Sequence, residues 1–222
     1  MLRKIYNQRT KIGKILSQKI IKDNFTIISD DCWGGQIYRQ LSIPYYTPTV
    51  GLWIGGDDYL KFIENLNNTN AYNIQKVNSK ETYPIGKSSD AQFHFLHYEN
   101  FDLAVRTFKR RYDRIIWNRL LYKIDLEKPV FNVEHIKKWN DMQLENSIAF
   151  YSDGVLKEWN GDIHNGVYIK NWNIDGTEMF DISRGYFNIF NWLNEGKINK
   201  SIIYSILNFL IFDPKVYRKL RK

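Results

Sequence analysis

The stretch Phe25-Thr-Ile-Ile-Ser-Asp-Asp-Cys-Trp-Gly-Gly35 decides the fold that this sequence predicts. Its aromatic and β-branched run, Phe25 to Ile28, is typical of a strand, and the polar residues Ser29 to Asp31 end that run abruptly. The pair Gly34-Gly35 then leads into Gln36 to Leu41, whose apolar residues have helical spacing. We therefore expect a strand, a tight loop and the start of a helix.

The loop after this strand is the expected ligand site. In an open α/β sheet, ligands collect at the carboxyl ends of the strands, where loops and helix N-termini surround one crevice. Glycine lets a ligand approach the main chain closely. The candidate binding residues of the loop are Ser29, Asp30, Asp31, Cys32, Trp33, Gly34 and Gly35.

A second segment repeats the pattern. Thr49 to Ile54 predicts another strand, Gly55-Gly56 ends it, and Asp57 or Asp58 caps a helix over Tyr59 to Leu66. The repetition favours an α/β fold with a mostly parallel sheet flanked by helices, in a Rossmann-like three-layer arrangement. Neither glycine pair matches a dinucleotide fingerprint or a phosphate loop.

The remaining elements are expected from periodicity and turn signals. The segment Arg114 to Ile124 is compatible with either a strand or more helix. We predict helices at 100–112, 133–144, 183–193 and 201–212, strands at 74–77, 147–152 and 167–172, a turn at 82–87 and a loop at 154–166. Gln92 to Tyr98 predicts a strand that ends in a loop carrying His97, Tyr98 and Glu99.

Composition indicates one folded domain over residues 1–222. The chain has 222 residues, of which 43% are hydrophobic, enough for one core. Aromatic residues make up 16%, which fits a large core and also stacking against sugar rings. We expect a basic amphipathic helix over residues 1–23 and a basic C-terminal tail.

The formal net charge of +8 is concentrated at the two ends of the chain. It favours an anionic partner, either a membrane surface touched peripherally or a substrate such as a nucleotide-linked sugar. A solvated basic surface without any partner is the alternative. Nucleic acid is not expected as a partner, because no binding module accompanies the charge.

The cysteine count and the hydropathy pattern predict a cytoplasmic protein. Its basic ends would place any peripheral membrane contact at the inner membrane face. Cys32 is the single cysteine, so no intramolecular disulfide can form. The N-terminal region lacks the continuous apolar core of a signal peptide, and no stretch reaches the roughly 20 apolar residues that span a bilayer.

The loop sequence closely resembles a bacterial family, the domain-of-unknown-function family nineteen-nineteen. The resemblance rests on Thr26-Ile-Ile-Ser-Asp-Asp-Cys-Trp-Gly-Gly35, and continues through 48–52, 58–62, 83–86, 95–98, 109–115 and 187–193. Members of that family are often labelled exopolysaccharide biosynthesis proteins. The resemblance implies a role in assembling a surface polysaccharide (exopolysaccharide, capsule or lipopolysaccharide) and assigns no catalytic residue. Where the family usually has an Asn-Asn pair or similar, this chain has Asp30-Asp31.

Our first hypothesis is therefore a transferase that acts on a nucleotide-activated sugar or a glycan acceptor. Asp31 or His97 would serve as the general base, with Cys32 as a further catalytic candidate. Arginines would neutralise a leaving diphosphate, and if a metal such as Mg²⁺ or Mn²⁺ is used, the pairs 30/31 or 57/58 would bind it. The further ligand-binding candidates are Asp57, Asp58, Tyr98, Glu99, Arg110, Arg111 and Arg114.

Each assignment has a structural alternative. Asp30 can turn the chain, Cys32 can be a small buried residue, and Trp33 can cover the core. His97 can be a structural histidine, and the arginines can be solvated helix charges. Two other classes of function remain open: a glycan- or nucleotide-binding regulator or scaffold without turnover, and a hydrolase that uses a Cys32–His97 pair.

Overall fold

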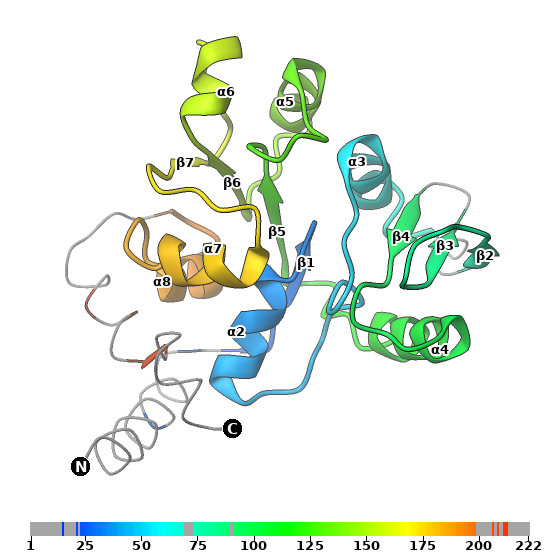
Figure 1. The fold of residues 1–222 in the computed structure, drawn as a ribbon. Helices are drawn as coiled ribbons and strands as arrows, with labels where there is room; N and C mark the ends of the chain where they lie inside the picture. The colour runs from blue at the N-terminus through cyan, green and yellow to red at the C-terminus, as the bar shows by residue number, and fades with distance from the viewer. Residues whose placement is uncertain are drawn as a thin grey trace, which may run out of the picture.

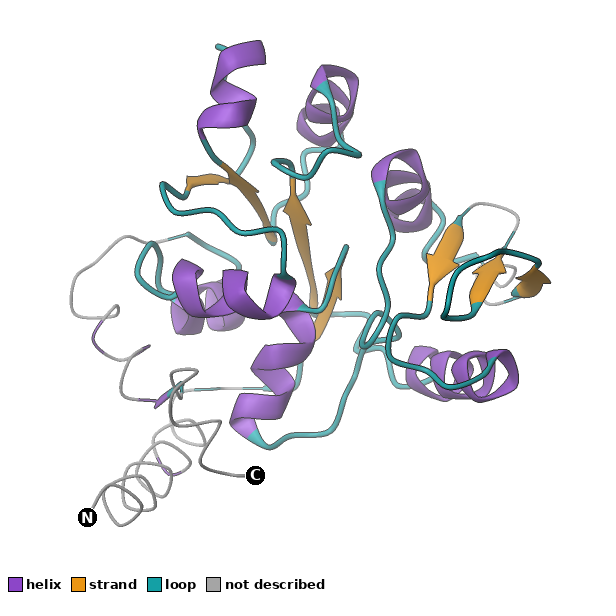
Figure 2. Cartoon of the chain, in the orientation of Figure 1, coloured by secondary structure: helices purple, strands orange, loops and turns teal. Residues whose placement is uncertain are grey.

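The computed structural model describes residues 15, 21, 23–68, 73–88, 91–198, 206, 208, 211 and 212. Its main sheet has four parallel strands in the order β1-β5-β6-β7 (Figures 1 and 2). The strands are β1 (Thr26–Ser29), β5 (Leu120–Asp125), β6 (Ser147–Tyr151) and β7 (Gly166–Tyr168). Because the strands are parallel, their carboxyl ends meet at one edge of the sheet.

Helices cover both faces of this sheet and complete three layers. Consecutive strand residues point to opposite faces, so Ile27 of β1 lies in one hydrophobic cluster and Ile28 in the other. The cluster around Ile27 includes α2 (Trp33–Leu41), α7 (Gly176–Ser183) and α8 (Ile189–Glu195). The cluster around Ile28 includes α3 (Gly56–Glu64), α5 (Val133–Asp141) and α6 (Asp153–Glu158). The predicted α/β class with a parallel, helix-flanked sheet is confirmed.

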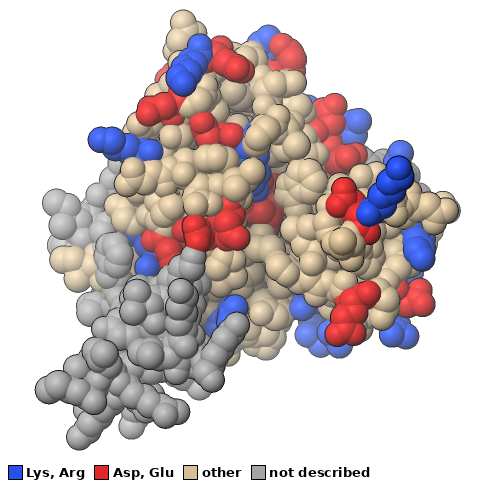
Figure 3. Space-filling model, viewed as in Figure 1, with Lys and Arg blue, Asp and Glu red and all other residues tan. Residues whose placement is uncertain are grey.

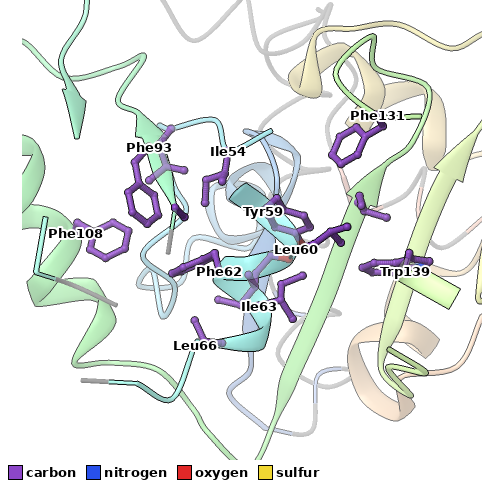
Figure 4. Packing of buried hydrophobic residues seen from close by; sticks show 14 of the residues in the cluster. Ile54, Tyr59, Leu60, Phe62, Ile63, Leu66, Phe93, Phe108, Phe131 and Trp139 are labelled. Atoms are coloured by element: carbon purple, nitrogen blue, oxygen red, sulfur yellow. Dashed lines mark hydrogen bonds between the residues drawn. The ribbon is translucent and has the colours of Figure 1, made fainter. Parts of the chain in front are cut away.

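A small antiparallel sheet lies beside the main one and packs into the hydrophobic cluster around Ile28. It consists of β2 (Gln75–Val77), β3 (Ile85–Lys87) and β4 (Gln92–His94), next to α4 (Phe101–Tyr112) (Figure 1). Figure 4 shows α3 between the two parts: Phe62 points toward Phe93 and Phe108, and Trp139 lies on the opposite side of the helix. One continuous core therefore joins the small sheet to the main sheet.

Tyr59 of α3 ties this helix to the sheet by a polar contact as well. Its buried hydroxyl oxygen lies 2.9 Å from the carbonyl oxygen of Ile28 and 2.7 Å from that of Lys123. The two carbonyl groups belong to β1 and β5, so one hydroxyl proton is shared between neighbouring strands near their carboxyl ends. This contact fixes the helix against the edge of the sheet where ligands are expected.

The prediction of a second strand at Thr49 to Ile54 is wrong. That segment forms a turn followed by one isolated bridge between Trp53 and His94, and Leu52 and Ile54 are buried without joining the main sheet. The neighbour of β1 is β5, which occupies the end of the segment 114–124 whose structure the sequence left undecided. The apolar pattern identified buried residues correctly but not their pairing.

Several smaller expectations are also corrected. The predicted turn 82–87 contains β3, the predicted loop 154–166 begins inside α6, and the predicted helix 183–193 is divided between α7 and α8. The helix α3 begins at Gly56, so Asp57 and Asp58 lie in its first turn and do not cap it. The other predicted strands and helices that fall within the described residues are found with somewhat different bounds.

The basic ends of the chain fall almost wholly outside the described residues, and so do the predicted N-terminal helix, most of the helix 201–212 and the basic tail. Across the described part of the chain, every helix is too short or too polar to cross a bilayer.

We expect Tyr59→Phe to lower the free energy of unfolding by about 1–3 kcal/mol, because it removes a buried hydroxyl from two strand carbonyl groups. The matched control is Tyr168→Phe, which removes a surface hydrogen bond of 2.7 Å to Asp153 and should leave stability essentially unchanged. Urea unfolding of both variants measures the difference. Equal stability of the two variants would contradict the bridging role of Tyr59.

Candidate functional site

Two aspartates and two lysines form a buried ion cluster at the carboxyl ends of β1 and β5. The Lys123 ammonium group lies 2.9 Å from Asp30 Oδ1 and 2.9 Å from Asp31 Oδ2. Lys128, in the turn after β5, lies 2.8 Å from Asp30 Oδ2 and 2.5 Å from Asp31 Oδ2. All four side chains are buried, and the two positive and two negative charges cancel. We call these four residues the ion cluster.

The surroundings of Asp31 hold it in the charged form. Burial alone would raise the pKa of its carboxyl group, but Lys123 and Lys128 outweigh burial and keep the pKa well below its usual range. Asp31 Oδ1 also accepts hydrogen bonds from the Trp33 backbone N–H at 2.9 Å and the Ser29 hydroxyl at 3.2 Å. The same charges act on Lys128: burial would lower its pKa, and the neighbouring carboxylates raise it well above its usual value.

A third acidic group, Asp125, lies at the end of β5, and its carboxyl pKa is shifted in the opposite direction to that of Asp31. Burial raises the pKa of its carboxyl group to about 7, and the positive charges of Lys123 and Lys128 only partly oppose that shift. Its Oδ1 accepts a hydrogen bond of 2.7 Å from the indole N–H of Trp172, while its buried Oδ2 has no partner within the described residues. Below about pH 7 this carboxyl group is mostly neutral, so there it leaves the charge balance of the ion cluster intact.

The ion cluster forms part of the floor of a cavity of about 550 Å³. Asp31 and Lys128 of the ion cluster line this cavity, and most of its wall is apolar. Leu96, Val130 and Ile174 are 38%, 39% and 60% exposed, so its mouth carries an apolar rim. Figure 3 shows a hollow near the centre of the molecule with basic and acidic atoms at its base. The remaining lining residues are Cys32, Trp53, His97, Pro129, Asp175, Gly176 and Thr177.

Trp53 forms a fixed part of this wall, although it lies in a loop. Its ring lies 4.6 Å from the ring of His94, centroid to centroid, and its backbone pairs with that residue. A side chain at Gly55 would come within 2.5 Å of the Trp53 ring, so only glycine leaves room for it there. The wall is therefore set by contacts within the small sheet and the turn beside it.

A second cavity of about 350 Å³ adjoins the first. Both are lined by Cys32, His97 and Thr177, so these three residues lie at the junction. The wall of the second cavity is more polar and carries two arginines, Arg39 and Arg111. Its other lining residues are Gly35, Gln36, Tyr45, Val50, Gly51 and Tyr98.

The structure brings together many of the residues that the sequence singled out. Asp30, Asp31 and Ser29 meet in and beside the ion cluster, and Cys32 and His97 line both cavities. Gly35, Tyr98 and Arg111 line the second cavity. Gly34 allows close packing of α2 on β1, because a side chain there would lie 3.0 Å from both Ile27 and Ser29.

Other predicted residues lie elsewhere. Trp33 is fully buried among aromatic rings, and its indole N–H donates to the Ser183 hydroxyl at 2.9 Å, so its role is that of a core residue. Asp57 and Asp58 lie in the first turn of α3, and Glu99 lies beside a separate cavity next to β3. Arg110 and Arg114 are exposed near the end of α4.

Cys32 is poorly suited to act as a nucleophile. Burial, assisted by the negative charge of Asp31, raises the pKa of its thiol to about 12. The thiol is therefore protonated at neutral pH, whereas the thiolate is the reactive form. This disfavours a hydrolase that depends on a Cys32–His97 pair.

The aspartate pair 30/31 does not fit a divalent cation, because every carboxylate oxygen already has a partner. Lysine ammonium groups contact three of the four oxygens, and the fourth accepts the two hydrogen bonds from Ser29 and Trp33. In the described part of the chain, His, Cys, Asp and Glu side chains do not assemble into a group of three that could hold a metal ion. Lys123 and Lys128 neutralise these two carboxylates, as a bound metal ion would otherwise do.

Sequence reasoning missed the basic half of the ion cluster and the residues that close the cavity. Lys123 interrupts the otherwise apolar run Leu120 to Ile124, and a lysine inside a buried strand is a signal that it is paired. The sequence Asp175-Gly-Thr177 carries a helix-cap signal as well: Asp175 accepts from the backbone of Thr177 and Glu178 at the start of α7. A side chain at Gly176 would lie 2.8 Å from the Asp31 carboxyl carbon, which shows how close α7 comes.

These features define an α/β protein with a two-part crevice at the carboxyl ends of its parallel strands. The chain belongs to the family described as Domain of unknown function (DUF1919), whose sequence model matches residues 3–194. It is also 24% identical over 200 residues to an uncharacterized protein of Haemophilus influenzae, covering 84% of this chain and 92% of that protein.

Asp125 makes stability depend on pH in a predictable direction. The carboxyl pKa is about 3.9 in an unfolded chain and about 7 in the folded protein. Between these values the unfolded chain loses the proton that the folded protein keeps, so this group's contribution to stability falls as pH rises to about 7 and is constant above it. Asp125→Asn removes this dependence.

We therefore compare the free energy of unfolding of Asp125→Asn with that of the unmodified protein at about pH 5 and about pH 8. The difference should shift in favour of Asp125→Asn by on the order of 2 kcal/mol from the lower to the higher pH. Chemical denaturation at the two pH values measures the gain. Asp141→Asn, which changes an exposed carboxyl group at the end of α5, is the control. Identical pH profiles for both variants would contradict the raised pKa of Asp125.

Proposed function

We propose that this protein is a transferase of surface-polysaccharide assembly that moves a sugar from a phosphate-activated donor, such as a nucleotide sugar, to a glycan acceptor. The observation that carries the proposal is the pair of adjoining cavities with His97 at their junction. A transferase must hold two reactants side by side, and much of its rate enhancement comes from that placement. The pathway itself comes from the label that members of the resembled family carry.

His97 is the best-supported candidate for the general base. Its side chain is exposed and borders both cavities, and imidazole is the group most often used for proton transfer near neutral pH. Its backbone N–H is fixed by a hydrogen bond of 3.1 Å to the Gly51 carbonyl oxygen. Asp31, the other candidate, is a weak base because its pKa is so low and both of its oxygens are occupied.

In the proposed reaction, His97 accepts the proton of an acceptor hydroxyl group. The hydroxyl oxygen forms a bond to the anomeric carbon of the donor sugar, and the bond from that carbon to the phosphate oxygen breaks. The phosphate leaves with the bonding electron pair, and positive charge beside the cavity stabilises it. The arginines of the second cavity supply that charge from this chain's own residues.

A second candidate function is a binding protein of the same pathway that has no turnover. The apolar rim formed by Leu96, Val130 and Ile174 favours it, because exposed apolar side chains around a cavity are typical of ligand binding. Such a protein would not depend on a general base, so the same experiment separates the two candidates.

The test replaces His97 by Ala or Gln in a strain that lacks the gene and makes its polysaccharide only when the gene is restored. We expect loss of polysaccharide, because removal of a general base slows transfer by about 10²–10⁴. Lys137→Ala, an exposed change on α5, is the control and should restore polysaccharide fully. The melting temperature of each purified variant shows whether it is folded.

Full polysaccharide production by a folded His97→Ala variant would reject the transferase and leave the binding protein. If the His97 variants are folded and lose polysaccharide while Lys137→Ala keeps it, the transferase is supported.

A further inference from the structure

We infer that the second cavity is a subsite for the phosphate groups of the substrate, held by Arg39 and Arg111. The inference deepens the proposed function and rests on it for the nature of the substrate. The binding step itself depends only on the charge and geometry of this cavity, so it can be tested separately. Arg39 is new to the site, since the sequence analysis singled out only Arg110, Arg111 and Arg114.

The cavity has positive charge that nothing in its wall neutralises. Its lining includes Arg39 and Arg111 but contains no aspartate or glutamate. Among the described residues, neither guanidinium group forms a salt bridge, whereas Arg119 and Arg184 both do. The first cavity differs, because Asp31 and Asp175 accompany Lys128 there. An anion is therefore favoured in the second cavity and not in the first.

Arg111 is held in position before any ligand arrives. Its Nη1 donates to the Tyr98 hydroxyl oxygen at 2.6 Å and to the Val50 carbonyl oxygen at 3.0 Å. Its guanidinium carbon also lies 4.8 Å from the centre of the Tyr45 ring. Both hydrogen bonds use Nη1, so within the described residues the edge formed by Nε and Nη2 keeps its donors. That edge has the geometry for a bidentate contact to phosphate.

Arg39 supplies the second charge from the last turn of α2. Its side chain is exposed at the cavity, and it lies one turn after Gln36, whose amide nitrogen is 3.4 Å from the Thr177 hydroxyl oxygen. Gln36 and Thr177 thus join α2 to α7 beside the junction of the two cavities. A phosphate between Arg39 and Arg111 would lie next to this junction, on the side away from the apolar rim.

The neutral part of the substrate then belongs in the first cavity. Trp53, Leu96 and Val130 give that cavity a largely apolar wall, which suits a flat ring or an aliphatic chain better than a free phosphate. The ligand class that fits both cavities is a diphosphate ester with an apolar or planar group. A nucleoside diphosphate and a prenyl diphosphate share this chemistry.

The test measures binding of inorganic pyrophosphate to the full-length protein by calorimetry at two salt concentrations. We expect Arg39→Ala and Arg111→Lys each to weaken binding about tenfold or more, and added salt to weaken binding to the unmodified protein. Arg106→Ala is the matched control, because Arg106 is an exposed arginine of α4 that lines neither cavity. Unchanged affinity in Arg39→Ala, or an equal loss in Arg106→Ala, would overturn the subsite.

The second arm compares pyrophosphate with a nucleoside diphosphate and with geranyl diphosphate. At least one ester should bind more tightly than pyrophosphate, and Leu96→Ser should remove that gain without weakening pyrophosphate itself. Whichever ester gains identifies the source of the phosphate. If neither binds more tightly, the assignment of the first cavity is wrong.

The two proposals fail in distinguishable ways. Pyrophosphate binding that depends on Arg39, together with normal polysaccharide in His97→Ala, keeps the subsite and rejects the transferase. Loss of polysaccharide in His97→Ala with arginine-independent pyrophosphate binding does the opposite.

Discussion

Four buried charges at the ends of two neighbouring strands organise this protein. Asp30 and Asp31 follow β1, Lys123 lies within β5, and Lys128 lies in the turn after it. Burying any one of these charges alone would be costly, so each depends on the other three in the folded core. The ion pairs connect β1 and β5 in the observed register, where Ser29 is paired with Lys123. The ion cluster therefore adds a charge constraint to the pairing of these two strands.

The same cluster determines the character of the crevice above it. Its charges cancel, so the floor of the first cavity is polar without attracting one sign of ligand strongly. Positive charge that remains available lies in the second cavity, on Arg39 and Arg111. The division into an apolar cavity and a cationic one follows from this separation, and it is what makes a substrate with a neutral part and a phosphate part fit.

Sequence reasoning predicted the fold class and the loop between β1 and α2 because the stretch from Phe25 to Gly35 carries strong local signals. It failed on the second strand, because the apolar residues of 49–54 are buried by packing and their β-pattern does not require a sheet partner. It left β5 undecided, since the segment before Leu120 is a turn that obscures the start of the strand.

The part of the site that sequence reasoning did not find depends on contacts between residues far apart in the chain. Asp30 and Lys123 are 93 positions apart, and Asp31 and Lys128 are 97 apart. No local pattern reveals such a pair, although a lysine inside the apolar strand β5 hints that a counter-charge exists. Ile174 and Thr177 are likewise placed by the return of the chain after β7, which periodicity does not describe. What the sequence shows locally is therefore half of the cluster and one side of the crevice.

The most direct test of this account is a double-mutant cycle on the ion cluster, measured by urea unfolding. Lys123→Met and Asp30→Asn should each lower the free energy of unfolding by about 3–5 kcal/mol, because each leaves the buried cluster with one charge that is not compensated. The double variant keeps the Lys128–Asp31 pair and a balanced charge, so it should be clearly more stable than the sum of the single losses predicts. Additive losses, or single losses below about 1 kcal/mol, would contradict the claim that these charges hold β1 and β5 together.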